Sequence, residues 1–380
     1  MPQQRQPLQR KSRKLRWLWV SLVWVLAPAA LLGLFQLCKG NQAWINFWVQ
    51  HITSPIKSGV SWLCAFLPFG VAEVVWAAGV LAVVGFLVRT VYLLVTRKGR
   101  LRRLLRRVLA LGSAALIVYT GYTLMWGANY YADTFSDLTG LTDRGTNATE
   151  LYTLLVAFSD RASGLAEEVE RDKDGLYIQD LNTLFAQATE VYDGLLEEFP
   201  CLTGPDRQPK AMAFSRILSY MGFTGFYFPF TGESMVNVDQ PEYLVPFTLL
   251  HELSHQRNIA SEEECNFLAI LAGVQSDNID FAYSACMAAY IHLSNALYKA
   301  DADLWADAAA HLSEAARADN RANSLYWAAL ESPAKAASQS VYSGVAKSYG
   351  QEDVLASYGA CVDLLAAYYF DYHPDAQFWS

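Results

Sequence analysis

Long runs of apolar residues dominate the first third of the chain. They cover residues 17–38, 71–95 and 108–126. A helix rises about 1.5 Å per residue, so about 20 residues cross the apolar core of a bilayer, which is roughly 30 Å thick. The first run is also longer than the apolar core of a signal peptide. The pattern predicts three transmembrane helices within residues 1–126. A further apolar stretch, 59–69, is too short to span, and we expect it at the interface or packed against the other helices.

Residues 127–380 show a different pattern, in which apolar positions recur at helical spacing between polar and alanine-rich faces. Aromatic and β-branched residues are concentrated in 225–238, which predicts a small sheet, and Pro229 suits an edge strand of that sheet. We therefore expect a mainly α protein with two domains. A membrane anchor, residues 1–126, is followed by an α+β domain, residues 127–380, that contains a small sheet.

Charge is distributed unevenly along the chain, whose net charge is −8. Residues 1–107 carry sixteen Lys and Arg and one acidic residue, whereas residues 108–380 carry 13 basic and 36 acidic residues. Basic clusters precede the first apolar run and separate the second from the third, and positively charged loops stay in the cytoplasm. We therefore expect a multi-pass protein of the cell membrane with a cytoplasmic amino terminus. Residues 127–380 would then be extracytoplasmic, and their acidity argues against nucleic acid as a partner.

The strongest chemical motif is His251-Glu252-Leu253-Ser254-His255. Positions i and i+4 share one face of a helix, so two imidazoles at this spacing can bind one Zn²⁺, and Glu252 can reach a water on the metal. Pro246 suits the start of this helix, and Asn258 suits the left-handed conformation that ends it. The alternative is a buried helix with two hydrogen-bonded histidines. The six cysteines form no C-x-x-C pair, so a cysteine zinc site is not expected.

A third metal ligand is expected on the next helix, which Ser261 can cap. Glu262 is the preferred candidate because Asn266 follows four residues later on the same face, where it can support a ligand histidine. Glu264 is the second candidate. The alternative for both glutamates is that they only stabilise the helix, because carboxylates in a first turn interact favourably with the helix dipole. Two histidines and one carboxylate leave a coordination position open for water, as in catalytic zinc sites.

These residue types predict hydrolysis of a peptide bond. Glu252 would take a proton from the activated water and deliver it to the leaving amine. A second group must stabilise the oxyanion, for which Tyr283 and His292 are the candidates downstream. The strand ending near Asn237 could pair with an extended peptide and present its carbonyl to the metal.

At the motif the chain resembles the gluzincin group of zincin metallopeptidases. In those enzymes a Glu-x-x-x-Asp helix supplies the third ligand and a supporting acid, and this chain has Glu262-x-x-x-Asn266 with Asn in place of Asp. The step Cys265-Asn266 is similar to the Cys-Asp step of membrane metallopeptidases of the beta-lactam sensor type.

A closer resemblance, over most of the chain, is to a family of bacterial membrane proteins known as a domain of unknown function. Its members have Gly-x-Tyr-x-Pro-Phe-Thr-Gly-Glu, His-Glu-Leu-x-His-Gln-Arg-Gly and Glu-x-Glu-Ala-Asn-Phe. This chain reads Gly225-Phe-Tyr-Phe-Pro-Phe-Thr-Gly-Glu233, His251-Glu-Leu-Ser-His-Gln-Arg-Asn258 and Glu262-Glu-Glu-Cys-Asn-Phe267. It departs from the family at Asn258 and Cys265. The resemblance implies a zincin-like fold and a peptidase.

The sequence therefore predicts a membrane-bound zinc metallopeptidase of the HExxH type that acts on a peptide or protein, with membrane lipid as its other partner. One alternative is a zincin-fold receptor or sensor that binds a peptide or cell-wall fragment without turnover. Another is an assembly protein of the membrane in which the motif holds a structural metal. The intact Glu252 favours the enzyme.

Overall fold

The computed structural model describes residues 6–142, 144–351, 359–374 and 378, and its contacts divide the chain into two compact units. Unit 1 consists of Met1–Thr53 and Val74–Tyr131, and unit 2 of Ser54–Glu73 and Ala132–Ser380. The described residues are mainly helical with one small sheet, as the sequence predicts.

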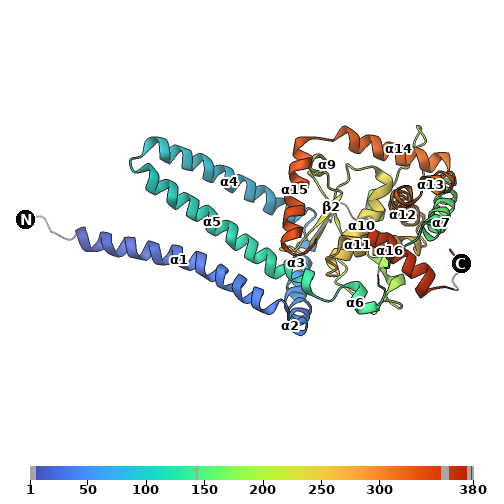
Figure 1. Ribbon diagram of the computed structural model, residues 1–380. Coiled ribbons are helices and arrows are strands. Elements are labelled where there is room, and N and C mark those ends of the chain that lie inside the picture. The colour runs from blue at the N-terminus through green and yellow to red at the C-terminus, as the bar shows by residue number, and fades with distance from the viewer. Residues whose placement is uncertain (1–5, 143, 352–358, 375–377, 379–380) are drawn as a thin grey trace, which may run out of the picture. The chain divides into compact units, whose positions relative to one another are not determined.

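All the described secondary-structure elements of unit 1 are helical. Its elements are α1 (Gln6–Cys38), α2 (Gln42–Phe47), the π-helical segment η1 (Trp48–Thr53), α4 (Val71–Thr96), α5 (Arg100–Met125) and the 3₁₀ segment η2 (Gly127–Tyr131). The first turn of α4, up to Glu73, belongs to unit 2. Figure 1 shows α4 and α5 as a helical hairpin. The ring of Phe35 on α1 packs edge-on against Trp44 and Tyr131, which fixes the end of α1 within this unit.

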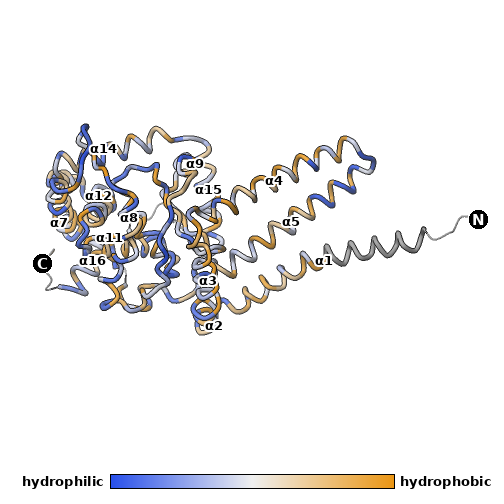
Figure 2. Tube along the Cα trace, turned by 180° about the vertical axis from the view of Figure 1, so that it is seen from behind, coloured by the Kyte–Doolittle hydropathy of each residue, from blue (hydrophilic) through white to orange (hydrophobic). Residues whose placement is uncertain are grey.

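Two helices, α4 and α5, are long and apolar enough to cross a membrane by length and composition. Figure 2 shows both as largely hydrophobic, with hydrophilic residues where they join. Among the side chains that the structure describes, the prediction of three spans is therefore corrected to two candidate spans. Of the first predicted span, 17–38, the apolar part whose side chains are described is Leu22–Cys38, which is shorter than α4 and α5; the side chains of 17–21 lie outside the described ones.

Unit 2 contains the sheet and most of the short helices. Its elements are α3 (Ser54–Ala65), α6 (Phe135–Thr139), α7 (Ala148–Ala166), α8 (Leu181–Gln187), η3 (Glu190–Leu195), η4 (Pro200–Leu202), β1 (Lys210–Ala211), α9 (Ser215–Met221), β2 (Gly225–Phe228), β3 (Glu233–Val236), η5 (Glu242–Leu244), α10 (Val245–Gln256), α11 (Glu262–Val274), α12 (Ile279–Ala300), α13 (Ala302–Ala309), α14 (Glu314–Ala329), α15 (Pro333–Ser348), α16 (Gly359–Ala366) and η6 (Ala367–Tyr372). The apolar stretch 59–69, which includes the end of α3, belongs to unit 2 and not to unit 1.

The sheet has the strand order β1-β3-β2. β2 runs antiparallel to β3 with Gly225 opposite Val236, and β1 runs parallel to β3 with Lys210 opposite Met235. β3 is central and fully buried, whereas β2 lies at an edge and is followed at once by Pro229, which has no N–H to donate to a neighbouring strand.

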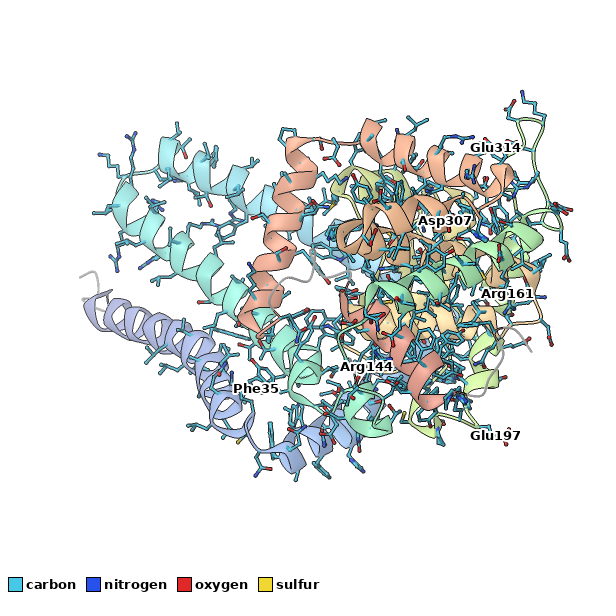
Figure 3. The ribbon with its side chains drawn as sticks, turned by 45° about the vertical axis from the view of Figure 1, so that its right-hand side comes forward. Phe35, Arg144, Arg161, Glu197, Asp307 and Glu314 are labelled. Atoms are coloured by element: carbon cyan, nitrogen blue, oxygen red, sulfur yellow. The ribbon has the colours of Figure 1, made fainter. Side chains whose placement is uncertain are left out.

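Four helices, α7, α10, α11 and α12, pack around one hydrophobic core in unit 2. Phe158, Leu253, Leu268 and Met287, one from each helix, are fully buried in it. Arg161 on α7, labelled in Figure 3, donates to the carbonyl of Val274 at the end of α11 at 2.7 Å. This core holds α10 and α11 in a fixed relation, which positions the candidate site.

Candidate metal centre

Local sequence signals explain where the motif helix α10 begins and ends. Pro246 stands in its first turn, where the missing N–H is not needed for helix hydrogen bonds. After the helix, Asn258 adopts the left-handed conformation (φ +70°) that the sequence predicts. Leu249, Leu250 and Leu253 are fully buried on one face, so the opposite face is free to present the histidines.

The next helix, α11, brings a carboxylate to those histidines. Ser261 caps it by accepting a hydrogen bond from the Glu264 N–H, as predicted. The ring Nε2 atoms of His251 and His255 lie 3.1 Å and 3.6 Å from Glu262 Oε2. One ligand atom from each of these three residues lies within 4.8 Å of the others. The structure therefore brings together His251, His255 and Glu262, the preferred ligand set.

Each of the three side chains has a partner for the atom that faces away from the cluster. His251 Nδ1 lies 2.9 Å from Asn266 Oδ1, and His255 Nδ1 lies 2.8 Å from the carbonyl of Ile259. A carbonyl oxygen only accepts, so His255 Nδ1 carries a proton and donates it to Ile259, and the other ring nitrogen, Nε2, faces Glu262. Such partners orient metal-binding imidazoles.

The third partner is Tyr342 on α15, which the sequence analysis did not single out. Its hydroxyl donates to Glu262 Oε1 at 2.5 Å, which leaves Oε2 directed at the two histidines. Tyr342 is 80 positions from Glu262 in the chain, and no local spacing connects the two. The general need of a carboxylate ligand for a hydrogen-bond donor implies that such a residue exists, but not which one it is.

Replacing Tyr342 by Phe is expected to weaken zinc binding by about 10–100-fold, because Glu262 loses the bond that orients it. Competition with a chromophoric zinc chelator measures this affinity. Tyr349, at the end of the same helix, is the matched control, and Tyr349→Phe should keep the parent affinity. Equal zinc affinities of the parent and Tyr342→Phe would show that Tyr342 does not support the metal site.

Glu252 lies beside the cluster in a buried position. Its side chain is 3% exposed, and its Oε2 atom has no hydrogen-bond partner among the described residues. Burial raises the pKa of Glu252 to about 7, although the nearby histidines act in the opposite direction. A Cβ on Gly225, the first residue of β2, would come within 2.5 Å of Glu252 Oε1. The absence of a side chain there leaves room for this carboxylate.

Glu262 has the opposite electrostatic setting. Burial alone would raise its pKa, but the charges and hydrogen bonds of His255 and His251 hold the pKa well below its usual value. The pKa of Glu262 is therefore lower than usual and that of Glu252 higher, so the two neighbouring carboxyl groups differ in their affinity for a proton. Two carboxyl groups with separated pKa values are typical of an acid–base site.

Glu264, the second candidate ligand, is not part of the cluster. Its carboxylate accepts hydrogen bonds from the N–H groups of Phe135 and Ser136 and from the Ser136 hydroxyl, at 2.9–3.2 Å. These groups form the first turn of α6, so Glu264 neutralises the exposed donors of another helix. Its role in the structure is therefore to hold α6.

Tyr283, the predicted oxyanion donor, also lies elsewhere. It is fully buried on α12, and its hydroxyl donates to Asp319 on α14 at 2.5 Å and is 3.4 Å from Arg171. None of His251, His255 and Glu262 is among these partners. Burial, together with the neighbouring His251, lowers the pKa of His292 to about 4, so its ring is uncharged at neutral pH.

Comparison with known proteins identifies a family. The chain belongs to a family of proteins of unknown function (DUF3810), whose sequence profile matches residues 48–366. No curated protein and no solved structure matches the chain. The matched range includes α10, α11 and α15, so every residue of the cluster and its surrounding hydrogen bonds lies within the family region.

Proposed function

We propose that the chain is a zinc-dependent metallopeptidase of the zincin type, held at the cell membrane by its apolar helices. The observation that carries the proposal is the convergence of His251, His255 and Glu262, with donor atoms within 4.8 Å of one another, beside the buried carboxyl group of Glu252. In this proposal unit 2 is extracytoplasmic, because its two parts lie before α4 and after α5, and the basic loop between these helices, residues 97–107, stays in the cytoplasm. The cytoplasmic amino terminus of the three-span prediction would need a further span before α4.

The donor set fits a catalytic zinc ion. Two imidazole nitrogens and one carboxylate oxygen are the ligands of known catalytic zinc sites, and they leave one coordination position for water. The unpartnered Glu252 Oε2 is the kind of buried acceptor that such a water would satisfy. Zinc bound there would act as a Lewis acid that polarises the substrate carbonyl and lowers the pKa of water toward about 7.

Glu252 then carries the proton through the reaction. With its pKa near 7 and its Oε2 unpartnered, it can accept a proton from the attacking water and return it to the amine of the departing chain. Glu262 remains an anion, and Tyr342 holds its other oxygen. The two carboxyl groups of the site therefore have different roles, one in proton transfer and one in metal binding.

In this proposal the substrate peptide binds along the open edge of β2. β2 pairs with β3 along one side only within the described residues, and its first residue, Gly225, lies next to Glu252. An extended peptide can add to an open strand edge through main-chain hydrogen bonds. A peptide bound there would bring a backbone carbonyl to Glu252, whatever its side chains, so the substrate is a polypeptide in an extended conformation.

The test is zinc-dependent cleavage by the full-length protein in detergent micelles. A mixture of unstructured peptides is incubated with the protein, and cleavage products are identified by mass spectrometry. We expect cleavage that stops when zinc is removed with 1,10-phenanthroline and returns when zinc is added back. Cleavage that continues without zinc would contradict the proposal. Peptide binding by the zinc-loaded protein without any cleavage would favour the receptor instead.

A further inference from the structure

We propose that α3, the loop that follows it and α9 form one surface of unit 2 that lies in the membrane interface. This lipid-contact surface consists of Trp62, Leu63, Phe66, Leu67, Phe69, Phe214, Ile217, Tyr220 and Met221. All nine side chains are exposed in the structure. The inference does not depend on the metal centre, because none of these residues belongs to it.

The polarity of α3 is inverted relative to a helix on the surface of a water-soluble protein. Its buried residues are Lys57, Ser61 and Cys64, at i, i+4 and i+7. Lys57 Nζ donates to Asn258 Oδ1 at 2.7 Å. By contrast, every exposed residue between Ser54 and Gly70 is apolar. Surface helices normally bury their apolar stripe and expose their polar one, so the outer face of α3 is suited to an apolar medium.

The apolar face continues onto α9. Phe214, Ile217 and Tyr220 recur every three residues and therefore share one face, and Met221 lies beside them. The other face of α9 is buried through Leu218, which packs with Ala72 in the first turn of α4. The exposed stripe is thus the side of α9 that faces away from the protein core.

Hydrogen bonds hold these two apolar segments next to each other. Lys210 Nζ donates to the carbonyls of Cys64 and Phe69 at 2.8 Å and 2.9 Å, which ties the loop after α3 to β1. Glu73 accepts hydrogen bonds from the N–H groups of Ala213 and Phe214 at 3.1 Å and 2.9 Å, which ties the start of α9 to the first turn of α4. The nine side chains therefore belong to one region of unit 2.

Lipid is the partner that this surface fits, because it is continuous in the chain with α4. That helix, which is long and apolar enough to cross a bilayer, begins at Val71, two residues after Phe69. A bilayer entered at Val71 has its interface at the residues just before that point. Trp, Tyr and Phe side chains are favoured in this interfacial layer, and exposed apolar patches of this kind mark interaction surfaces.

The proposal has a consequence for the substrate, which rests on the function proposed above. Asn258, which is bound by Lys57 and Ser54 of α3, follows the ligand His255 by three residues. The carboxyl end of the motif helix thus contacts the inner face of α3, and the outer face of α3 is part of the lipid-contact surface. Polypeptide segments close to the bilayer surface would reach the site most readily.

The experiment places spin labels on the full-length protein in vesicles of phosphatidylcholine and phosphatidylglycerol. Single cysteines replace Leu63 (59% exposed, α3) and Ile217 (58% exposed, α9), with Leu325 (71% exposed, α14) as the matched control. Cys38 and Cys201, the native cysteines that are not buried, are changed to Ser. The collision rates of each label with oxygen, which concentrates in lipid, and with a water-soluble nickel chelate are then measured. Circular dichroism spectra check that each labelled protein is folded.

We expect the labels at 63 and 217 to collide more often with oxygen than with nickel, and the label at 325 to show the reverse order. A label at 63 or 217 that meets nickel as often as the label at 325 would place this surface in water and overturn the proposal. Shielding of either label from both reagents would also overturn it, because the surface would then be covered by protein, either by unit 1 or by a second copy. A failure of zinc binding would leave these results unchanged.

Discussion

Replacing Glu252 by Gln is expected to lower the rate of peptide hydrolysis by about 10²–10⁴-fold, the range that general acid–base groups contribute. Glutamine has nearly the same shape but cannot accept the proton of the attacking water. Glu252 is not one of the three ligand residues, so the variant should keep its zinc. Measuring the cleavage rate and the zinc content of the same preparation separates the two effects.

Glu167→Gln is the matched control for this change. Glu167 is exposed at the end of α7, and the same carboxylate-to-amide substitution there should leave both cleavage and zinc content unchanged. If Glu252→Gln retains the full cleavage rate, Glu252 is not the proton carrier, and the mechanism fails even where zinc is present.

Replacing Glu262 by Ala is expected to have the second largest effect, a loss of zinc affinity. Removing only a supporting hydrogen bond costs about 10–100-fold in affinity, and the loss of Glu262 should exceed that. Of the three proposed ligands, Glu262 is the only carboxylate, and a cation binds less tightly without its negative charge. Competition with a zinc chelator measures the affinity, as for Tyr342→Phe.

Glu264→Ala is the comparison that distinguishes the two candidate ligands. Its zinc affinity should match the parent, but the protein should be less stable, because the donors at the start of α6 lose their acceptor. Each buried donor left without a partner costs about 1–3 kcal/mol, and thermal unfolding measures the loss. Equal loss of zinc in both variants would contradict the assignment of Glu262.

The parts of the site that the sequence predicts correctly are those determined by local spacing. The i, i+4 relation of His251 and His255, the proline in the first turn of α10 and the left-handed Asn258 all depend on residues of one helix and its ends. The position of Asn266 four residues after Glu262 likewise predicts its hydrogen bond to His251. Helix geometry places groups on one face of a helix, and the hydrogen bond between Asn266 and His251 needs in addition that α11 packs against α10.

The parts that the sequence does not predict depend on contacts between distant segments. Tyr342 reaches Glu262 only because the fold brings α15 to the first turn of α11, and no spacing in the chain indicates this. Glu264 differs from Glu262 because α6 brings two N–H groups to it, although both glutamates occupy the same first turn. Tyr283 is a similar case, since the position of Asp319 decides where its hydroxyl points.

The fold was predictable to a similar degree. The aromatic stretch around β2 and β3 indicates the sheet, whereas β1 has two residues and no recognisable pattern. The inverted polarity of α3 is not evident from its run of apolar residues. Its apolar residues predict a place at the interface or packing against other helices, and only the structure shows that Lys57 and Ser61 face inward.

Zinc content per chain in the purified full-length protein tests the central claim most directly. The parent, His251→Ala and the control His311→Ala are measured together, because His311 pairs with Asp160 outside the cluster. The account predicts one zinc per chain in the parent and in His311→Ala, and none in His251→Ala. A folded parent that binds no zinc, or a His251→Ala variant that keeps it, would contradict the account.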